Sequence, residues 1–151
     1  GIKKYCDEQI VPLFKDDILI VMSDLPNGKA LAKTFLVKEN NKYTLNQRIG
    51  RITIKDTSKL LSIFVNYYIN RTRQLTKYDN GTDQTNLKKD QILSVQIPLP
   101  PLEEQQRIVT ILDKFDTLVN SISEGLPKEI ALRRKQYEYY REKLLTFTNN
   151  Q

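Results

Sequence analysis

The feature that most constrains this chain is a seam of apolar residues that follows a proline-rich entry over 98–101. Proline fixes φ and lacks a backbone N–H, so the entry is extended and Pro101 suits the first position of a helix. Apolar side chains then recur at spacings of four, three, four and three, which is a coiled-coil seam rather than a broad globular face. A single stripe of this kind is unstable on an isolated helix and requires a partner helix. The seam consists of Ile108, Leu112, Phe115, Val119 and Ile122.

A second helix is predicted after the interruption at 124–127, where Pro127 can occupy its first turn. Two helices of about 20 residues would each span about 30 Å. Residues 101–151 are therefore predicted to form a helical, coiled-coil-forming arm that serves as spacer and dimerisation element, with a break near 124–127. The predicted helix-pairing interface adds Ile130, Tyr137 and Leu144 to the seam.

Residues 1–100 read as a mixed α/β region, so the predicted fold class is α+β. Short apolar runs predict strands at 18–22, 33–37, 49–54 and 93–97. Apolar residues at helical spacing over 61–69 predict a helix that follows an Asp56-Thr57-Ser58 start signal.

The connections in this region are predicted from their polar and turn-forming residues. Pro26-Asn27-Gly28 indicates a turn within 24–29, and residues 76–86 indicate a polar loop. Asn86 is predicted to cap a short helical turn that runs to Ile92.

The positive charge of the chain lies wholly in the first region. The 151 residues carry a net charge of +6 without any histidine. Residues 1–100 hold 16 Lys/Arg against 10 Asp/Glu, whereas residues 101–151 hold 8 of each. A basic region attached to a neutral helical arm suggests an anionic partner for the basic region.

Several classes of chemistry are excluded by residues that the sequence lacks. Without histidine, a triad with an imidazole base and a histidine-containing zinc site are impossible. Cys6 alone can form neither an internal disulfide nor a four-cysteine metal site. No apolar run approaches 18 residues and no signal peptide is recognisable, so a cytoplasmic protein is expected. Because the chain begins at Gly1, we expect a fragment or a processed form.

A family resemblance appears in the second half of the sequence. Residues 97–109 read IPLPPLEEQQRIV, and the pattern continues through ILDKF at 111–115, EGLP at 124–127 and RKQYEYYR at 134–141. Upstream, GTDQTNL at 81–87 resembles the element that precedes this signature, and SDLPNGK at 23–29 and LNQRI at 45–49 resemble parts of the same family's recognition domain. The chain resembles the specificity (S) subunits of type I restriction–modification systems, which act in the cytoplasm of bacteria or archaea.

The resemblance implies a function without turnover. Such a subunit is not an enzyme: its target-recognition domains bind double-stranded DNA, and its helices pair into an antiparallel coiled coil that fixes their separation. It implies as partners methyltransferase (M) subunits and, in the full complex, a restriction (R) subunit. No cofactor is expected in this chain, whereas S-adenosylmethionine, ATP and Mg are expected on the partner subunits. The chain is expected to contain one recognition region, residues 1–100, which is N-terminally incomplete, and one arm, residues 101–151. It is therefore expected to be a half-subunit or a fragment.

The residues expected to contact DNA lie in the basic region, although ordinary solvated charge explains them equally well. Arg71 and Arg73 follow a helix, where cations are favourable for structural reasons alone, and we favour that role over DNA contact for them. Gln84-Thr85-Asn86 is expected to pack domain against helix rather than read bases. The predicted DNA-binding residues are Lys29, Lys33, Asn46, Gln47, Arg48 and Arg51.

Two other readings stay open on the sequence alone. The chain could be a coiled-coil assembly or interaction protein whose truncated recognition domain no longer reads DNA. It could also be a metal-dependent nuclease built from carboxylates and a lysine, although no convincing constellation is present. If the helical arm forms a homodimer, a two-fold arrangement would imply a palindromic bipartite DNA site.

Overall fold

A three-stranded antiparallel sheet lies at the centre of the first region in the computed structural model, which describes residues 11–26, 28–121 and 127–146. Its order is β3 (Thr34–Leu36), β1 (Ile18–Val21), β4 (Ile49–Ile52). Ile18 pairs with Leu36 on one side and with Ile52 on the other. The three strands predicted from the apolar runs before residue 55 are thereby confirmed.

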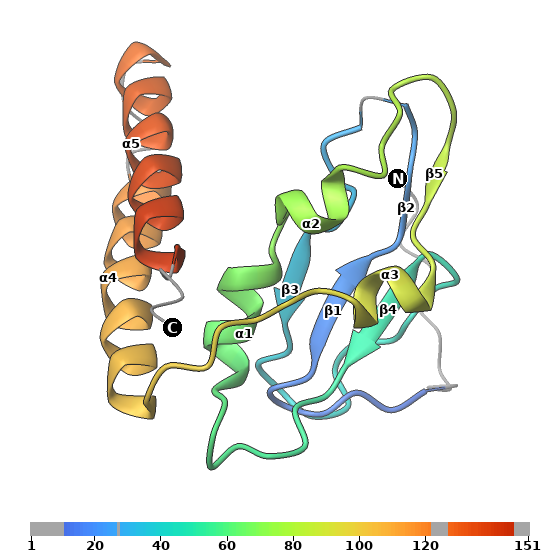
Figure 1. Cartoon of the computed structure of the whole chain (residues 1–151), viewed down its shortest axis with the longest axis horizontal. Coiled ribbons are helices and arrows are strands. Elements are labelled where there is room, and N and C mark those ends of the chain that lie inside the picture. Colours follow the sequence, from blue (N-terminus) through green and yellow to red (C-terminus); the bar gives the residue numbers. More distant parts are fainter. Residues whose placement is uncertain (1–10, 27, 122–126, 147–151) are drawn as a thin grey trace.

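Helix α1 (Ser62–Ile69) is the middle layer of the molecule (Figure 1). Val65 and Ile69 pack with Ile18 of the sheet, whereas Phe64 packs against α4. A helix that is apolar on several sides is stable only when it is covered on those sides, and SIFVNYYI has that composition. The predicted helix over 61–69 is confirmed, but it begins several residues after Asp56. Asp56 instead accepts the backbone N–H of Ser58 in a turn before the helix.

A two-stranded ribbon and two short helices complete the first region. Strand β2 (Ser23–Asp24) pairs antiparallel with β5 (Thr85–Asn86). Helices α2 (Arg73–Thr76) and α3 (Lys89–Leu93) cover a second apolar cluster that contains Ile20, Leu31, Leu75 and Leu87. The prediction of a polar loop over 76–86 was wrong at both ends, because Thr76 belongs to α2 and Thr85–Asn86 forms β5.

Two further predictions around α3 were also wrong. Asn86 belongs to β5, and the N-cap position of α3 is Lys88, whose N–H donates to Gln91 Oε1 at 2.8 Å. Residues 94–97 form no strand. The amide of Gln74 takes both hydrogen bonds that a neighbouring strand would take, since Gln96 N–H donates to Oε1 at 2.9 Å and Nε2 donates to Gln96 O at 3.0 Å. The side-chain amide of Gln74 therefore replaces the backbone hydrogen bonds that a neighbouring strand would form with Gln96.

The two long helices run side by side, as predicted (Figure 1). Helix α4 spans Leu102–Ser121 and α5 spans Pro127–Leu145, and they pack against each other. Pro101 lies one position before the helix, where its carbonyl accepts the N–H of Gln105 at 3.0 Å. The predicted break near 124–127 falls mostly outside the described residues. No helix in the described part of the chain is long and apolar enough to cross a membrane.

Candidate nucleic-acid interface

The outer face of the three-stranded sheet forms a shallow depression. Side chains alternate along a strand, so Leu19 and Val21 face away from the core that Ile18 and Ile20 enter. Leu19, Val21, Phe35 and Ile49 line a depression of about 300 Å³ together with Lys33 and Asn46, two of the predicted DNA-binding residues. Phe35 is 43% exposed and meets the edge of Tyr43 at 5.2 Å between ring centroids.

This combination of side chains suits nucleic acid chemically. Lysine ammonium groups donate to phosphate oxygens, and amide side chains pair with base edges. A partly exposed aromatic ring offers an apolar surface to a base or a thymine methyl group. Two of the predicted residues, Lys33 and Asn46, therefore share one surface with the exposed ring of Phe35.

Lys29 lies on a loop that the carboxylate of Asp24 holds in place. Asp24 Oδ2 accepts the N–H groups of Ala30 at 2.7 Å and Leu31 at 3.0 Å, and Oδ1 accepts that of Leu25 at 2.9 Å. These bonds, that from Ala30 first, lower the pKa of the Asp24 carboxyl below its ordinary value. A Cβ at position 28 would lie 2.1 Å from Asp24 Oδ2, so only glycine fits beside the carboxylate. The exposed side chain of Lys29 is thus presented by a preorganised loop.

Asn46, Gln47 and Arg48 form the turn that enters β4. Asn46 Oδ1 accepts the N–H of Arg48 at 2.8 Å, and its backbone carbonyl accepts that of Ile49 at 3.2 Å. All three side chains are exposed. Asn46 therefore shapes the turn as well as lining the depression.

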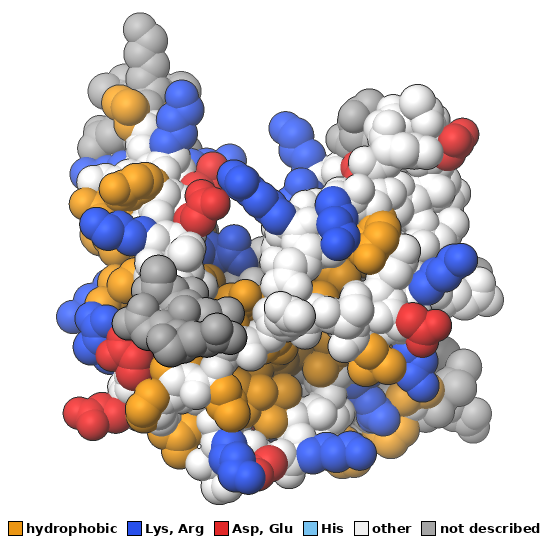
Figure 2. All heavy atoms as spheres, in the orientation of Figure 1, with side chains coloured by type: hydrophobic (Ala, Val, Ile, Leu, Met, Phe, Trp, Pro, Cys, Tyr) orange, Lys and Arg blue, Asp and Glu red, His pale blue; other side chains and the backbone are white. Residues whose placement is uncertain are grey.

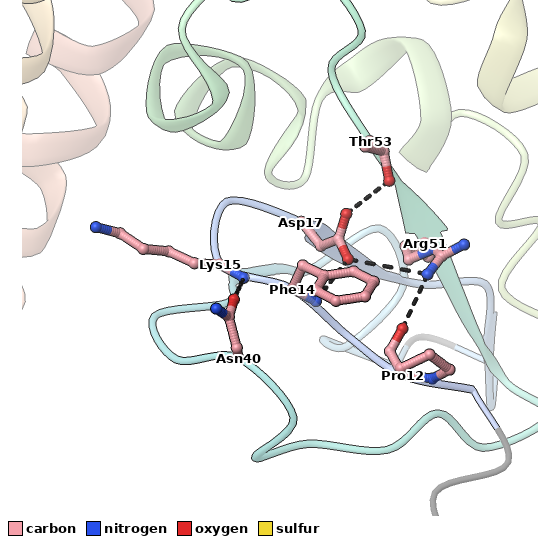
Figure 3. A network of polar contacts seen from close by, with 7 residues as sticks. All are labelled: Pro12, Phe14, Lys15, Asp17, Asn40, Arg51 and Thr53. Atoms are coloured by element: carbon pink, nitrogen blue, oxygen red, sulfur yellow. Dashed lines mark hydrogen bonds and ion pairs between the residues drawn. The ribbon is translucent and has the colours of Figure 1, made fainter.

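Arg51 is held by contacts within the chain (Figure 3). Its Nη1 donates to the carbonyl of Pro12 at 3.0 Å and lies 4.0 Å from Asp17 Oδ2. Asp17 is only 3% exposed and accepts the hydroxyl of Thr53 at 2.6 Å and the N–H of Phe14 at 2.9 Å. The guanidinium thus ties the segment before β1 to β4, which is the structural role that competes with DNA contact at this position.

The element over 84–86 packs as the ribbon strand beside β2. Gln84 Nε2 donates to Ser23 Oγ at 2.8 Å, and Asp24 pairs with Thr85. These contacts are within the first region, at the base of the Asp24 loop. They favour a structural role for the element, although its partner is a strand and not a helix of the arm.

The predicted helix-pairing residues divide into three groups. Ile108 and Leu112 are buried against Phe64, with Leu144 and Tyr137 packed on the same cluster. Phe115 stacks on Tyr140 at 5.4 Å between centroids, and Val119 is partly buried. Ile122 lies outside the described residues, and the side chain of Ile130 is also undescribed.

Gln105 joins the arm to the first region and was missed from the sequence. Its side chain is fully buried, and its Nε2 donates to the carbonyls of Lys59 and Pro100, each at 2.8 Å. Its Oε1 accepts the N–H of Leu61 at 3.0 Å. The signal was available, because the seam extended three residues back from Ile108 arrives at Gln105. A polar residue at a seam position indicates a buried hydrogen-bonding role.

Arg141 makes a second junction that was also missed. Its guanidinium donates to the carbonyls of Tyr67, through Nε at 3.1 Å, and of Asn70, at the C-terminal end of α1. Burial lowers the pKa of Arg141, although an arginine stays protonated in proteins. Tyr67 also donates its hydroxyl to Asp113 Oδ1 of α4, and burial, followed by this bond, raises the pKa of Tyr67.

Among the described residues, no group of three or more Cys, Asp or Glu side chains could hold a metal ion.

Comparison with known proteins identifies related chains. The family model described as type I restriction modification DNA specificity domain matches residues 1–132. The specificity subunit of the type I restriction enzyme EcoR124I/EcoR124II from Escherichia coli is 58% identical over 67 residues, which are 44% of this chain and 17% of that protein. A protein of Haemophilus influenzae assigned as a type I restriction enzyme specificity subunit is 40% identical over 137 residues, 89% of this chain and 33% of that one.

A solved structure shares the fold. It is described as the structural basis underlying complex assembly and conformational transition of the type I R-M system. The alignment has a TM-score of 0.62 at 20% identity and covers 93% of this chain and 33% of the solved chain. The present chain therefore spans about a third or less of the proteins it matches here.

Proposed function

Because this chain belongs to the family of type I restriction modification DNA specificity domains, we propose that it recognises a specific sequence of double-stranded DNA as all or part of a specificity subunit. The family match carries the proposal, since it covers residues 1–132, which include the whole basic region and more than half of the helical arm. In this function the chain itself performs no turnover. It binds DNA and positions the subunits that carry the chemistry.

The division of labour follows the charge. Residues 1–100 act as the recognition domain, and residues 101–151 act as the spacer. Lys29, Lys33 and Arg48, all exposed, supply phosphate contacts, while Asn46 and Gln47 supply contacts to base edges. The depression beside Phe35 supports this assignment because it gathers a cation, an amide and an aromatic ring on one surface.

The partners follow from the family. Methyltransferase subunits with S-adenosylmethionine, and a restriction subunit with ATP and Mg, complete the assembly around the arm. A homodimer through the arm is a further proposal. Since Ile108 and Leu112 are already covered within the chain, it would use side chains farther along the helices, where Leu132 is 68% and Tyr139 is 60% exposed. Sedimentation as a monomer at high protein concentration would contradict the homodimer.

The test of the proposed function is binding to duplex DNA followed by methylation mapping. The chain is titrated with a random-sequence duplex over a range of salt concentrations, and log K is expected to fall linearly with log[salt]. Adenine methylation is then mapped across a genome with and without the chain, in the presence of the methyltransferase subunits. We expect one motif that depends on the chain. Methyltransferase binding without any DNA affinity would favour an assembly protein and contradict DNA recognition.

A further inference from the structure

A cleft separates the first region from α5, and charged side chains lie on both of its walls (Figure 2). Arg71, in the turn between α1 and α2, and Arg73, the first residue of α2, line one wall, and Glu138, Arg141 and Glu142 line the other. Its volume is about 310 Å³. Three guanidinium groups against two carboxylates leave the cleft with a positive balance.

The backbone of Arg71 is in a conformation that arginine rarely adopts. Its φ of 54° lies in the left-handed region, which is sterically unfavourable for a non-glycine residue. The position is fixed because the N–H of Arg71 donates to the carbonyl of Ala32 at 2.8 Å. Glycine or asparagine would satisfy the same geometry with less strain, so the backbone alone gives no reason for an arginine here.

The side chain of Arg71 is also incompletely paired. Within the described residues, Arg71 Nη1 is one of two buried side-chain nitrogen or oxygen atoms that have no hydrogen-bond partner. A buried donor without a partner is rare in proteins and costs free energy. Nη1 itself has almost no contact with solvent, so a ligand in the cleft would bind through the other nitrogens of the guanidinium. Strain and an unpaired donor at one residue are features that cluster at functional sites.

The other charged groups of the cleft differ in how strongly they are already paired within the chain. Arg141 is used by the carbonyls at the end of α1. Arg73 lies 3.5 Å from Glu142, but the two side chains are 90% and 63% exposed, and an ion pair so exposed is weak. Arg73 can therefore exchange Glu142 for a stronger anion. Asp24 interacts with Arg71 through its charge only.

The cleft adjoins the surface proposed to bind DNA. Ala32, which holds the backbone of Arg71, immediately precedes Lys33, and Thr34 N–H donates to Asn70 Oδ1 at 3.2 Å. The turn that carries Arg71 is therefore bonded to the start of β3, where Lys33 begins the depression on the sheet.

We propose that Arg71 and Arg73 bind a backbone phosphate of duplex DNA in the cleft between α5 and the first region. The proposal rests on the proposed function and adds a contact outside the sheet surface. Arginine suits this role because its planar guanidinium donates two parallel hydrogen bonds to a phosphate. The contact would position DNA against both the recognition region and the arm, without reading its sequence.

The experiment separates binding from folding. The full chain and its variants Arg71→Asn and Arg71→Gly are titrated with a random-sequence duplex, and inorganic phosphate alone is the second probe. Arg134→Gln, which removes one charge from an exposed position on α5, is the control. We expect about tenfold weaker duplex binding for both Arg71 variants and a salt slope smaller by about one, with the control close to wild type. The urea midpoint is expected to stay equal or rise, because both replacements relieve the left-handed backbone.

Other outcomes would overturn the proposal in distinguishable ways. Wild-type binding to the duplex with unchanged affinity in the Arg71 variants rejects the phosphate contact and leaves the proposed function intact. Phosphate binding that depends on Arg71, with duplex affinity that does not, assigns the cleft to a free anion. A fall in the urea midpoint of both variants shows that Arg71 is structural. If the wild-type chain binds no duplex, the proposed function itself fails.

Discussion

Gln105 Oε1 accepts the backbone N–H of Leu61 at 3.0 Å, so a residue of α4 completes the N-terminus of α1. Leu61 occupies the N-cap position of α1 and has no side-chain hydrogen bond of its own to offer. In a capping box, the side chain of a Glu or Gln three residues into the same helix accepts this N–H. Here the acceptor comes from 44 residues farther along the chain.

Replacing Gln105 is expected to destabilise the protein by about 3 kcal/mol. Gln105→Leu keeps the side-chain volume but leaves the Leu61 N–H and the carbonyls of Lys59 and Pro100 without their partner, and each unsatisfied buried group costs about 1–3 kcal/mol. Urea unfolding measures the change. Gln106→Leu, at the exposed neighbouring position, is the control, and equal effects of the two replacements would contradict the buried role of Gln105.

Removing the guanidinium of Arg141 is expected to cost about 2 kcal/mol and to loosen α5 from α1. Arg141→Met retains much of the apolar stem but leaves the carbonyls of Tyr67 and Asn70 without their donor. Urea unfolding gives the free energy, and hydrogen exchange of the α1 amides reports the local loosening. Arg134→Met on the exposed face is expected to change neither, and unchanged exchange in Arg141→Met would refute the junction.

A methyl group at position 28 is expected to displace the Asp24 carboxylate. Gly28→Ala would place a Cβ 2.1 Å from Asp24 Oδ2, so the bonds to Ala30 and Leu31 would break and the loop that carries Lys29 would lose its order. The loss of stability should be about 1 kcal/mol, and the backbone amide resonances of Ala30 and Leu31 should move. Gly50→Ala is the comparison, because there the Cβ meets the movable thioether of Met22 at 2.7 Å.

The order of the loop that carries Lys29 is expected to change with pH only in the acidic range. Hydrogen bonds to the ionised carboxylate, that from Ala30 first, lower the pKa of Asp24 in the folded protein below the ordinary 3.8. A depressed carboxyl pKa contributes stability above the unfolded value, and this is lost as the pH falls through the folded value. The Ala30 and Leu31 amides should therefore titrate below pH 3.8 by NMR. Titration at or above that pH, or an identical profile in Asp24→Asn, would contradict the assignment.

Arg51 and Arg48 are expected to differ in stability and in DNA binding. Arg51→Gln loses the bond to Pro12 and the charge beside the buried Asp17, so it should lower the free energy of unfolding by about 1–2 kcal/mol. Arg48→Gln removes an exposed side chain and should leave stability within about 0.5 kcal/mol. On the proposed function it should instead weaken duplex binding. Reversed effects would exchange the roles assigned to the two residues.

The elements whose pattern reflects local packing were predictable. The apolar runs identified β1, β3 and β4, and helical spacing identified α1 and the two long helices. The turn around Gly28 followed from its residue types. In β1 the inward alternate residues Ile18 and Ile20 are buried, and in α4 the seam residues Ile108 and Leu112 are buried.

The elements set by side-chain bonding to distant backbone were not predictable. Gln74 replaces a strand partner for Gln96, and Gln105 replaces a local cap for α1, so neither is visible in the composition of its own segment. The partner of the apolar seam on α4 was also predicted only in part. A partner helix was required, but the sequence does not show that Phe64 of α1 shares the cover of Ile108 with α5. The same limit applies to Arg71, whose strained backbone depends on Ala32.

Gln105 and Arg141 hold opposite ends of α1 through main-chain atoms: the former binds the N–H of Leu61 and the carbonyl of Lys59, and the latter binds the carbonyls of Tyr67 and Asn70. Every amino acid offers those carbonyls, and every one except proline offers that N–H. The contacts that hold the arm to α1 therefore tolerate most side chains at these positions. A first region of different sequence could therefore be joined to the same arm, provided that its backbone follows the same path through α1.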